Sequence, residues 1–135
     1  MDLTKTLQIA AAGMRAQGFR LRIVAENMAN ANSTATEPGG DPYRRRMVTF
    51  KNALDRQLGI VTVQVDKVVT DDAEFEKDFD PNHPAADATG YVKMPNVNSL
   101  IEITDMREAQ RSYEANLKVL EAARGMLQRS VDLLR

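Results

Sequence analysis

The strongest constraint on the fold is a long heptad repeat in the last quarter of the chain, between Asn98 and Leu134. Two of its positions are polar, Gln110 and Arg124. The spacing by three and four predicts one helix whose stripe runs about 54 Å at about 1.5 Å per residue. A stripe of that length needs a partner helix of similar length. The apolar members are Ile103, Met106, Tyr113, Leu117, Leu120, Leu127, Val131 and Leu134.

The start of this helix is predicted at a capping box formed by Ser99 and Glu102. In that motif the serine hydroxyl accepts the N–H of Glu102, and the glutamate reaches back to the N–H of the serine. No proline follows these residues. The sequence therefore predicts a continuous C-terminal helix over residues 98–135.

The other end of the chain repeats the pattern over residues 2–30, with Gln17 as the only polar position of its stripe. Gly13 and Gly18 each cost a helix about 1 kcal/mol relative to alanine, so this helix needs packing to be stable. We expect the two terminal helices to bury each other's stripes, in either a parallel or an antiparallel pair. The apolar members here are Leu3, Leu7, Ala10, Met14, Leu21, Val24 and Met28.

The middle of the chain is predicted to be a small β-rich insert. β-Branched residues over 60–70 give its best strand, with shorter strands at 46–50, 74–80 and 90–94 and one helical turn at 52–57. The expected fold class is α+β, with long terminal helices paired as a coiled coil. The predicted parts are a helix over 1–32, a loop over 33–42, an insert over 43–97 and a helix over 98–135.

Composition narrows the class of protein. The chain has no cysteine, a net charge of −1 and only 5% aromatic residues, which argues against disulfides and against general attraction to nucleic acid or anionic lipid. No apolar run reaches the roughly 18 residues of a membrane span, so we expect no direct membrane insertion. The N-terminus also does not resemble a secretory signal, so any work outside the cytoplasm requires a different export route.

Candidate chemical sites are weak. Asp78, Asp80 and Asn82 are spaced like the start of an EF-hand loop, but His83 and Thr89 replace its required glycine and glutamate. The single histidine cannot complete a histidine-based metal site, and we interpret it as a turn residue. The sequence thus predicts no catalytic, cofactor or metal site, and no enzyme.

The basic run Arg44–Arg46 is the one compact cluster of positive charge. Without a second cluster or interleaved aromatics it does not indicate a nucleic-acid site. We expect an exposed patch that meets an acidic neighbouring subunit.

Two segments rich in asparagine are further candidates for contacts between helices. Asn27 and Asn30 lie on one helical face, and Ala25 and Ala29 permit close backbone approach, which favours a polar, directional packing contact. Helix capping and turn formation is the simpler alternative. The segment 111–116 is similar, with a solvated face as its alternative.

These motifs resemble the flagellar rod and hook family of axial proteins, and in particular its proximal-rod members. The resemblance covers nearly the whole chain and departs at Ser33–Thr36, where many relatives have an Asn-Thr-x-Gly-Tyr run. The elements that carry it are Ala25-x-Asn27-Met28-Ala29-Asn30-x-Asn32, Pro42-Tyr43-Arg44-Arg45-Arg46 with Phe50, Asp80-Pro81-x-His83-Pro84, Gly90-Tyr91-Val92, Pro95-Asn96-Val97-Asn98 and Arg111-Ser112-Tyr113-x-Ala115-Asn116.

The resemblance implies a structural subunit of the proximal rod, which transmits torque across the periplasm. The implied partners are other copies of the chain, neighbouring rod proteins and the flagellar type III export apparatus. It also implies terminal segments that are disordered before assembly. A standalone coiled-coil interaction module is the alternative function. The predicted assembly interface comprises Leu7, Met14, Leu21, Ala25, Asn27, Met28, Ala29, Asn30, Asn32, Asn96, Val97, Asn98, Arg111, Tyr113, Asn116, Leu117, Leu120 and Leu127.

Overall fold

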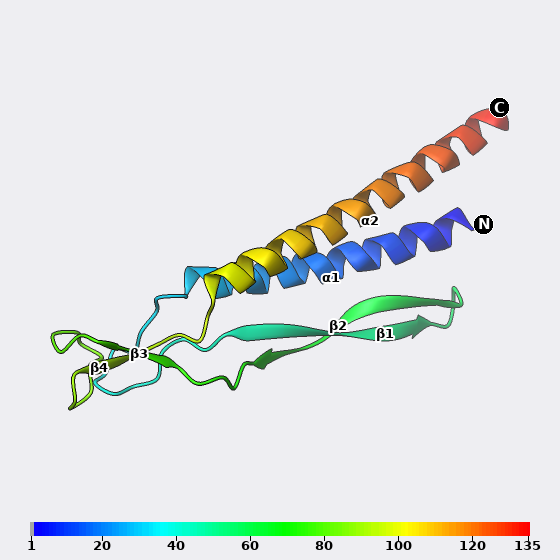
Figure 1. Cartoon of the computed structure of the whole chain (residues 1–135). Helices are drawn as coiled ribbons and strands as arrows, with labels where there is room; N and C mark the ends of the chain where they lie inside the picture. Colours follow the sequence, from blue (N-terminus) through cyan, green and yellow to red (C-terminus); the bar gives the residue numbers. More distant parts are fainter. Residues whose placement is uncertain (1) are drawn as a thin grey trace. The chain divides into compact units, whose positions relative to one another are not determined.

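The computed structural model of the chain describes residues 2–135 and has an α+β fold, as predicted (Figure 1). A long helix stands at each end of the chain, and all four strands lie between them in sequence. No helix within residues 2–135 is both long and apolar enough to cross a membrane. The elements are α1 (Leu3–Ala29), β1 (Arg46–Asp55), β2 (Ile60–Thr70), β3 (Glu76–Phe79), β4 (Tyr91–Met94) and α2 (Ser99–Leu133).

Both helices begin at an acid or amide cap. The Thr4 N–H donates to Asp2 Oδ1 at 2.9 Å at the start of α1. At the start of α2 the Leu100 N–H donates to Asn98 Oδ1 at 3.0 Å, so Asn98 is the N-cap. The predicted capping box of Ser99 and Glu102 is therefore wrong, because the Glu102 side chain turns into the protein interior instead.

The strands form two separate two-stranded sheets, β1–β2 and β3–β4. β1 continues to Asp55, so the helical turn predicted over residues 52–57 is wrong. Asp55 Oδ1 instead accepts the N–H groups of Gln57 at 2.9 Å and Leu58 at 3.2 Å, which closes the turn into β2. Gly59 completes this turn with φ of 63°, a value that glycine adopts without strain.

The β3–β4 hairpin is antiparallel, with Lys77 opposite Lys93 and Phe79 opposite Tyr91. Because side chains alternate along a strand, these four residues share one face and their neighbours share the other. Val92 on the second face is buried. The hairpin thus has an inner face and an outer face that carries two lysines and two aromatic rings.

The chain's contacts divide it into two compact units, and each contains parts of both helices. The terminal unit consists of Met1–Leu21, Val48–Lys67 and Arg107–Arg135, and the central unit of Arg22–Met47 and Val68–Met106. Small residues dominate the buried positions of the terminal unit, whereas the central unit buries Ile23, Val24 and Val92. No large aromatic core is present among the described residues, in keeping with the low aromatic content.

Candidate assembly interface

A buried ionic cluster organises the central unit. Glu102 on α2 is fully buried, at 0% exposure, and its carboxylate accepts hydrogen bonds from Arg45 Nε and from Asn27 Nδ2, the latter at 3.2 Å. Arg45 also contacts Asp105 at 3.2 Å and Asp71 at 3.5 Å. A buried charge is tolerated only when it is paired and hydrogen-bonded, and this carboxylate meets both conditions.

Asn27 joins the end of α1 to the segment that leads into β1. Its Nδ2 donates to the Arg46 carbonyl at 2.8 Å, and its Oδ1 accepts the Arg46 N–H at 3.0 Å and the Tyr43 hydroxyl at 2.7 Å. At 1% exposure, Asn27 has no surface left for another molecule. Its directional contact is made inside the chain, where it ties α1, residues 43–46 and α2 together.

Burial and charge shift two pKa values in this cluster. Burial acts to lower the pKa of Arg45, but its hydrogen bond and charge attraction to Glu102 outweigh that effect and leave the pKa raised. Burial raises the pKa of the Tyr43 hydroxyl, because the ionised phenol would lose hydration. Both residues therefore hold their ordinary neutral-pH charge states in the folded chain.

The basic run does not form an exposed patch, so that expectation is wrong. Arg44 lies 4.2 Å from the centre of the Phe75 ring and donates to the Asp71 carbonyl at 2.9 Å. Arg46 pairs with Glu26 at 2.8 Å. Each arginine is used within the central unit, because the loop before β1 passes acidic side chains and free carbonyl groups there.

In the terminal unit the two helices run antiparallel and touch through small residues. A Cβ atom on Gly13 would lie 2.7 Å from Asn116 Nδ2, so the backbone of α1 comes very close to α2 here. Arg20 lies 3.5 Å from Glu108 further along the pair. Ala109 and Ala123, which share heptad spacing with Asn116, are buried.

The inward stripe is displaced by one residue from the predicted stripe on each helix. On α1 the contacts fall at Gly13 and Arg20 rather than at Met14 and Leu21. On α2 the closest contact falls at Asn116 rather than at Leu117, and Tyr113 of the predicted stripe also meets α1, with Cε2 3.9 Å from where a Cβ atom on Gly18 would lie. One residue turns a helix by about 100°, so large members of the predicted stripes such as Met14 and Leu117 lie beside the contact and are half-buried. Two smaller members of the α1 stripe, Ala10 and Val24, are buried as predicted.

The C-terminal end of α2 extends beyond α1. Because Gly13 lies opposite Asn116, Leu3 at the start of α1 comes opposite Met126, ten residues out on each helix. α2 continues to Leu133, and its apolar side chains in this last part are exposed. The exposed members are Met126, Leu127, Val131 and Leu133, followed by Leu134 just past the helix.

The predicted interface residues fall into three groups by exposure. One is buried, Asn27. Eleven are half-buried: Leu7, Met14, Leu21, Met28, Asn30, Asn96, Val97, Tyr113, Asn116, Leu117 and Leu120. Six are exposed: Ala25, Ala29, Asn32, Asn98, Arg111 and Leu127.

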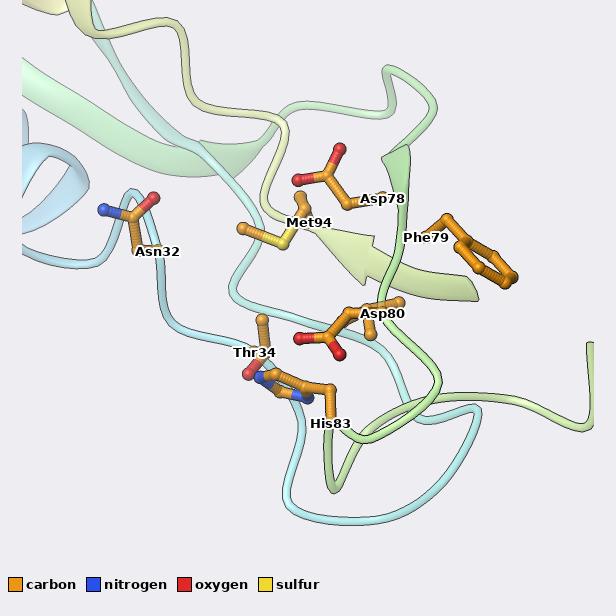
Figure 2. A pocket seen from close by; sticks show the side chains of 8 residues that line it. Asn32, Thr34, Asp78, Phe79, Asp80, His83 and Met94 are labelled. Carbon is orange, nitrogen blue, oxygen red and sulfur yellow. The ribbon is translucent and has the colours of Figure 1, made fainter. Parts of the chain in front are cut away.

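A hollow of about 570 Å³ in the central unit collects several polar side chains (Figure 2). Asp78, Asp80 and His83 lie around it, while the ring of Phe79 points away from it. His83 Nδ1 accepts the Ala85 N–H at 3.0 Å, which makes it a turn residue as predicted. Within residues 2–135 no group of three acidic or histidine side chains is placed to hold a metal ion.

Comparison with known proteins decides the family. Residues 88–133 match the family model of the flagellar basal body rod FlgEFG protein C-terminal region. The flagellar basal-body rod protein FlgC of Agrobacterium fabrum is 51% identical over 133 residues, covering 98% of this chain and 96% of that protein. The chain belongs to the FlgC family.

Other FlgC proteins agree over the same span. The Salmonella typhimurium protein is 39% identical over 135 residues, covering 98% of both chains. The Bacillus subtilis protein is 36% identical over 148 residues, covering 98% of this chain and 99% of that one. The FlgC relationship therefore includes both helices and all four strands.

Sequence reasoning missed two features of this FlgC chain. The first is the pairing of Arg45 with Glu102, because Glu102 also fitted a capping motif. The second is the small-residue contact of the helices, for which the signal was present in the heptad spacing of Ala109, Asn116 and Ala123. The stripe one residue further on is polar at Gln110 and Arg124, but its other members, such as Leu117 and Leu120, gave a stronger apolar signal.

Proposed function

We propose that the chain is a structural subunit of the bacterial flagellar proximal rod in the periplasm. Copies of it assemble helically with neighbouring rod proteins and transmit torque. Membership of the FlgC family, whose members are named flagellar basal-body rod proteins, is the observation that carries this proposal. The resemblance noted in the sequence further supports delivery through the flagellar type III export apparatus.

The half-buried apolar stripes support an assembly role. Leu7, Met14 and Leu21 on α1, with Leu117 and Leu120 on α2, are only half-buried although they repeat at heptad spacing. Fully burying one large aliphatic side chain contributes about 1.5–3 kcal/mol, so neighbours that cover these stripes would gain substantial free energy. We assign the assembly interface to these stripes and to the end of α2, with Asn27 acting from inside the chain.

A complementation experiment tests the proposal. Cells that lack their own FlgC protein receive this chain with a small tag, and basal bodies are purified and probed for the tag. Recovery of the chain in the rod and restored swimming are expected, whereas a chain that is made but absent from basal bodies contradicts the proposal.

The interface assignment has a matched pair of variants on α2. Leu117→Asp places a charge on the half-buried stripe and is expected to abolish swimming, because a charge without a partner is costly to bury. Lys118→Asp changes the next, exposed residue and is expected to retain swimming. Equal swimming by both variants contradicts the assignment.

The alternative, a standalone coiled-coil module, differs in solution. Such a module would be fully helical at both ends as a dilute monomer or dimer. Circular dichroism across a dilution series separates the two functions, because a rod subunit is expected to gain helix with assembly.

A further inference from the structure

The outer face of the β3–β4 hairpin carries an exposed aromatic pair. Phe79 is 66% exposed and Tyr91 is 43% exposed, and their rings meet edge to face with centroids 5.3 Å apart. No other aromatic residue within residues 2–135 is exposed. Exposed aromatic side chains in a cluster are a frequent mark of a protein interface.

Two lysines lie beside the rings on the same face. Lys77 and Lys93 are direct cross-strand partners, and like charges in that position destabilise a hairpin. Lys93 contacts Asp41 at 3.1 Å. Lys77 has no salt bridge within residues 2–135, although its charge helps to lower the pKa of Asp87. The face is therefore aromatic and basic, and it suits a partner that supplies carboxylates.

The Phe79 ring packs against the turn that precedes β4. Gly90 precedes β4 with φ of 86°, and a Cβ atom there would lie 2.9 Å from Phe79 Cε2 and 3.2 Å from Pro81 Cγ. The Phe79 ring thus rests directly over Gly90. Any other residue at position 90 would carry a Cβ atom that pushes the ring away.

The central unit also contains a hollow with acidic side chains and an apolar lining, which complements the basic and aromatic face of the hairpin. It has a volume of about 390 Å³ and lies before the start of α2, with Pro95 and Val97 as its apolar lining. Glu74 and Glu76 line it from the segment that enters β3, are exposed, and form no ion pair among residues 2–135. Asn96 supports the hollow, because its Nδ2 donates to the Asp71 carbonyl at 2.9 Å and to the Ala73 carbonyl at 3.1 Å.

We propose that the outer face of the hairpin, Lys77, Phe79, Tyr91 and Lys93, docks into the acidic hollow of a second copy of this chain. The two lysines face Glu74 and Glu76 of the other copy, and an aromatic ring enters the hollow. This proposal deepens the proposed function and rests on it, since it names one contact of the rod assembly.

The geometry of such a contact has a consequence for assembly. Each copy offers one hairpin face and one hollow, and the contact is heterologous when the hairpin of each copy binds the hollow of the next copy. A heterologous contact extends from copy to copy and builds rings or helical arrays. The hairpin and the hollow therefore supply a repeating link in the rod.

Cross-linking tests the contact directly, because the chain has no cysteine of its own. Cells produce two differently tagged copies, one with Lys77→Cys and one with Glu74→Cys, and purified basal bodies are oxidised. A disulfide-linked pair containing both tags is expected. Copies with Lys67→Cys and Asp72→Cys, two exposed positions outside both surfaces, serve as the matched control and are expected to stay unlinked.

The outcomes separate this contact from the function itself. Tagged chains that reach the basal body but link no more than the control overturn the contact and leave the rod function intact. Tagged wild-type chains that are absent from basal bodies overturn the function as well.

Charge reversal gives a second test that does not depend on thiol geometry. Lys77→Glu or Glu74→Lys alone is expected to weaken the contact about 30-fold, the size of a hot-spot truncation, and to reduce incorporation into rods. Both changes in one chain restore opposite charges at every contact and are expected to recover incorporation. If the double variant is incorporated into rods no better than the single variants, the proposal is overturned. Lys67→Glu is the control for the effect of a changed net charge alone.

Discussion

At the scale of single residues, one buried carboxylate links three segments of the central unit. Glu102 is stabilised only when Asn27 and Arg45, which are far from it in sequence, lie beside it. If the three segments separate, the carboxylate, the guanidinium and the amide become hydrated again. The cluster therefore makes the ordering of the three segments cooperative. A buried ion pair often adds little net stability, but removal of one partner is costly. Its main effect here is to fix the register between the two helices.

Replacement of Glu102 by glutamine is expected to destabilise the central unit by about 3 kcal/mol, the lower end of the cost of breaking a buried pair. Arg45 keeps Asp71 and Asp105, which limits the loss. Urea unfolding followed by circular dichroism measures the change. Glu108→Gln, in a pair at 3.5 Å on the surface, is the control and is expected to cost under about 1 kcal/mol.

Tyr43 makes the central unit sensitive to alkaline pH. Burial raises its pKa in the folded chain above the value of the unfolded chain. The folded state therefore holds this proton more tightly, so its contribution to stability is present below the ordinary tyrosine pKa and is lost as pH rises through the raised value. Tyr43→Phe is expected to lose about 1 kcal/mol at neutral pH, from the bond to Asn27, and to show a weaker alkaline decline.

Unfolding midpoints of Tyr43→Phe and the unaltered chain, measured from pH 7 into the alkaline range, provide the comparison. Parallel declines in the two proteins would show that Tyr43 does not cause the alkaline sensitivity.

At the scale of elements, each helix carries two stripes with different partners. The small stripe, with Gly13 on α1 and Ala109 and Ala123 on α2, brings the backbones together within the chain. The large stripe, with Met14 and Leu117, lies one residue on and stays half-buried. If the large residues formed the contact between α1 and α2, less apolar surface would remain for contacts with neighbouring subunits.

Periodicity in the sequence was sufficient to predict both helices and the strand over residues 60–70, because each has a long, regular pattern. It was not sufficient to choose between adjacent stripes, since heptad spacing is the same for Asn116 as for Leu117. Nor could it find the partner of Glu102, which depends on a loop that folds back from a distant position. Local motifs such as a capping box do not contain that information.

Substitution of glycine by alanine tests the close helix contact. In a helix this change ordinarily gains about 1 kcal/mol, and Gly125→Ala is expected to do so because nothing lies within 4 Å of the added atom. Gly13→Ala is expected to gain nothing or to destabilise, since the new Cβ would displace Asn116 from its 3.0 Å bond to the Ser112 carbonyl.

Thermal unfolding of the two glycine variants measures the difference. The double variant Gly13→Ala with Asn116→Ala makes room for the new atom and is expected to recover part of the gain. Equal stabilisation by Gly13→Ala and Gly125→Ala would show that the helices do not approach closely at this position.

At the scale of the whole molecule, the chain leaves a large share of its apolar side chains in solvent. Leu127 and Val131 on the last part of α2 have no cover from α1, and Leu134 beyond the helix is 88% exposed. A small core of mostly small residues is marginal for ordering the terminal unit on its own. Neighbouring copies that cover these side chains would offset the entropy of ordering the chain ends.

Proteolysis of the dilute chain tests how order is distributed. That residues 43–97 fold as a separate insert stays a prediction. The contacts at Glu102 predict more exactly which residues a protease-resistant fragment contains. Because Asn27 and Glu102 bind residues 43–46, the protected fragment is expected to retain the end of α1 and the start of α2. Cleavage is expected first within residues 2–21 and 107–135, where the helix pair buries mainly small residues and leaves its large apolar side chains half-buried or exposed.

Mass spectrometry of the early fragments identifies the cut sites, and Glu102→Gln is the informative variant. Loss of the buried carboxylate is expected to move the first cuts inward, towards residues 22–29 and 99–106, while Glu108→Gln leaves the unaltered pattern. Cuts at the two ends of residues 43–97 in the unaltered chain would show instead that the insert folds without the helices. Equal resistance along the whole dilute chain would mean that order at its ends does not depend on neighbouring subunits.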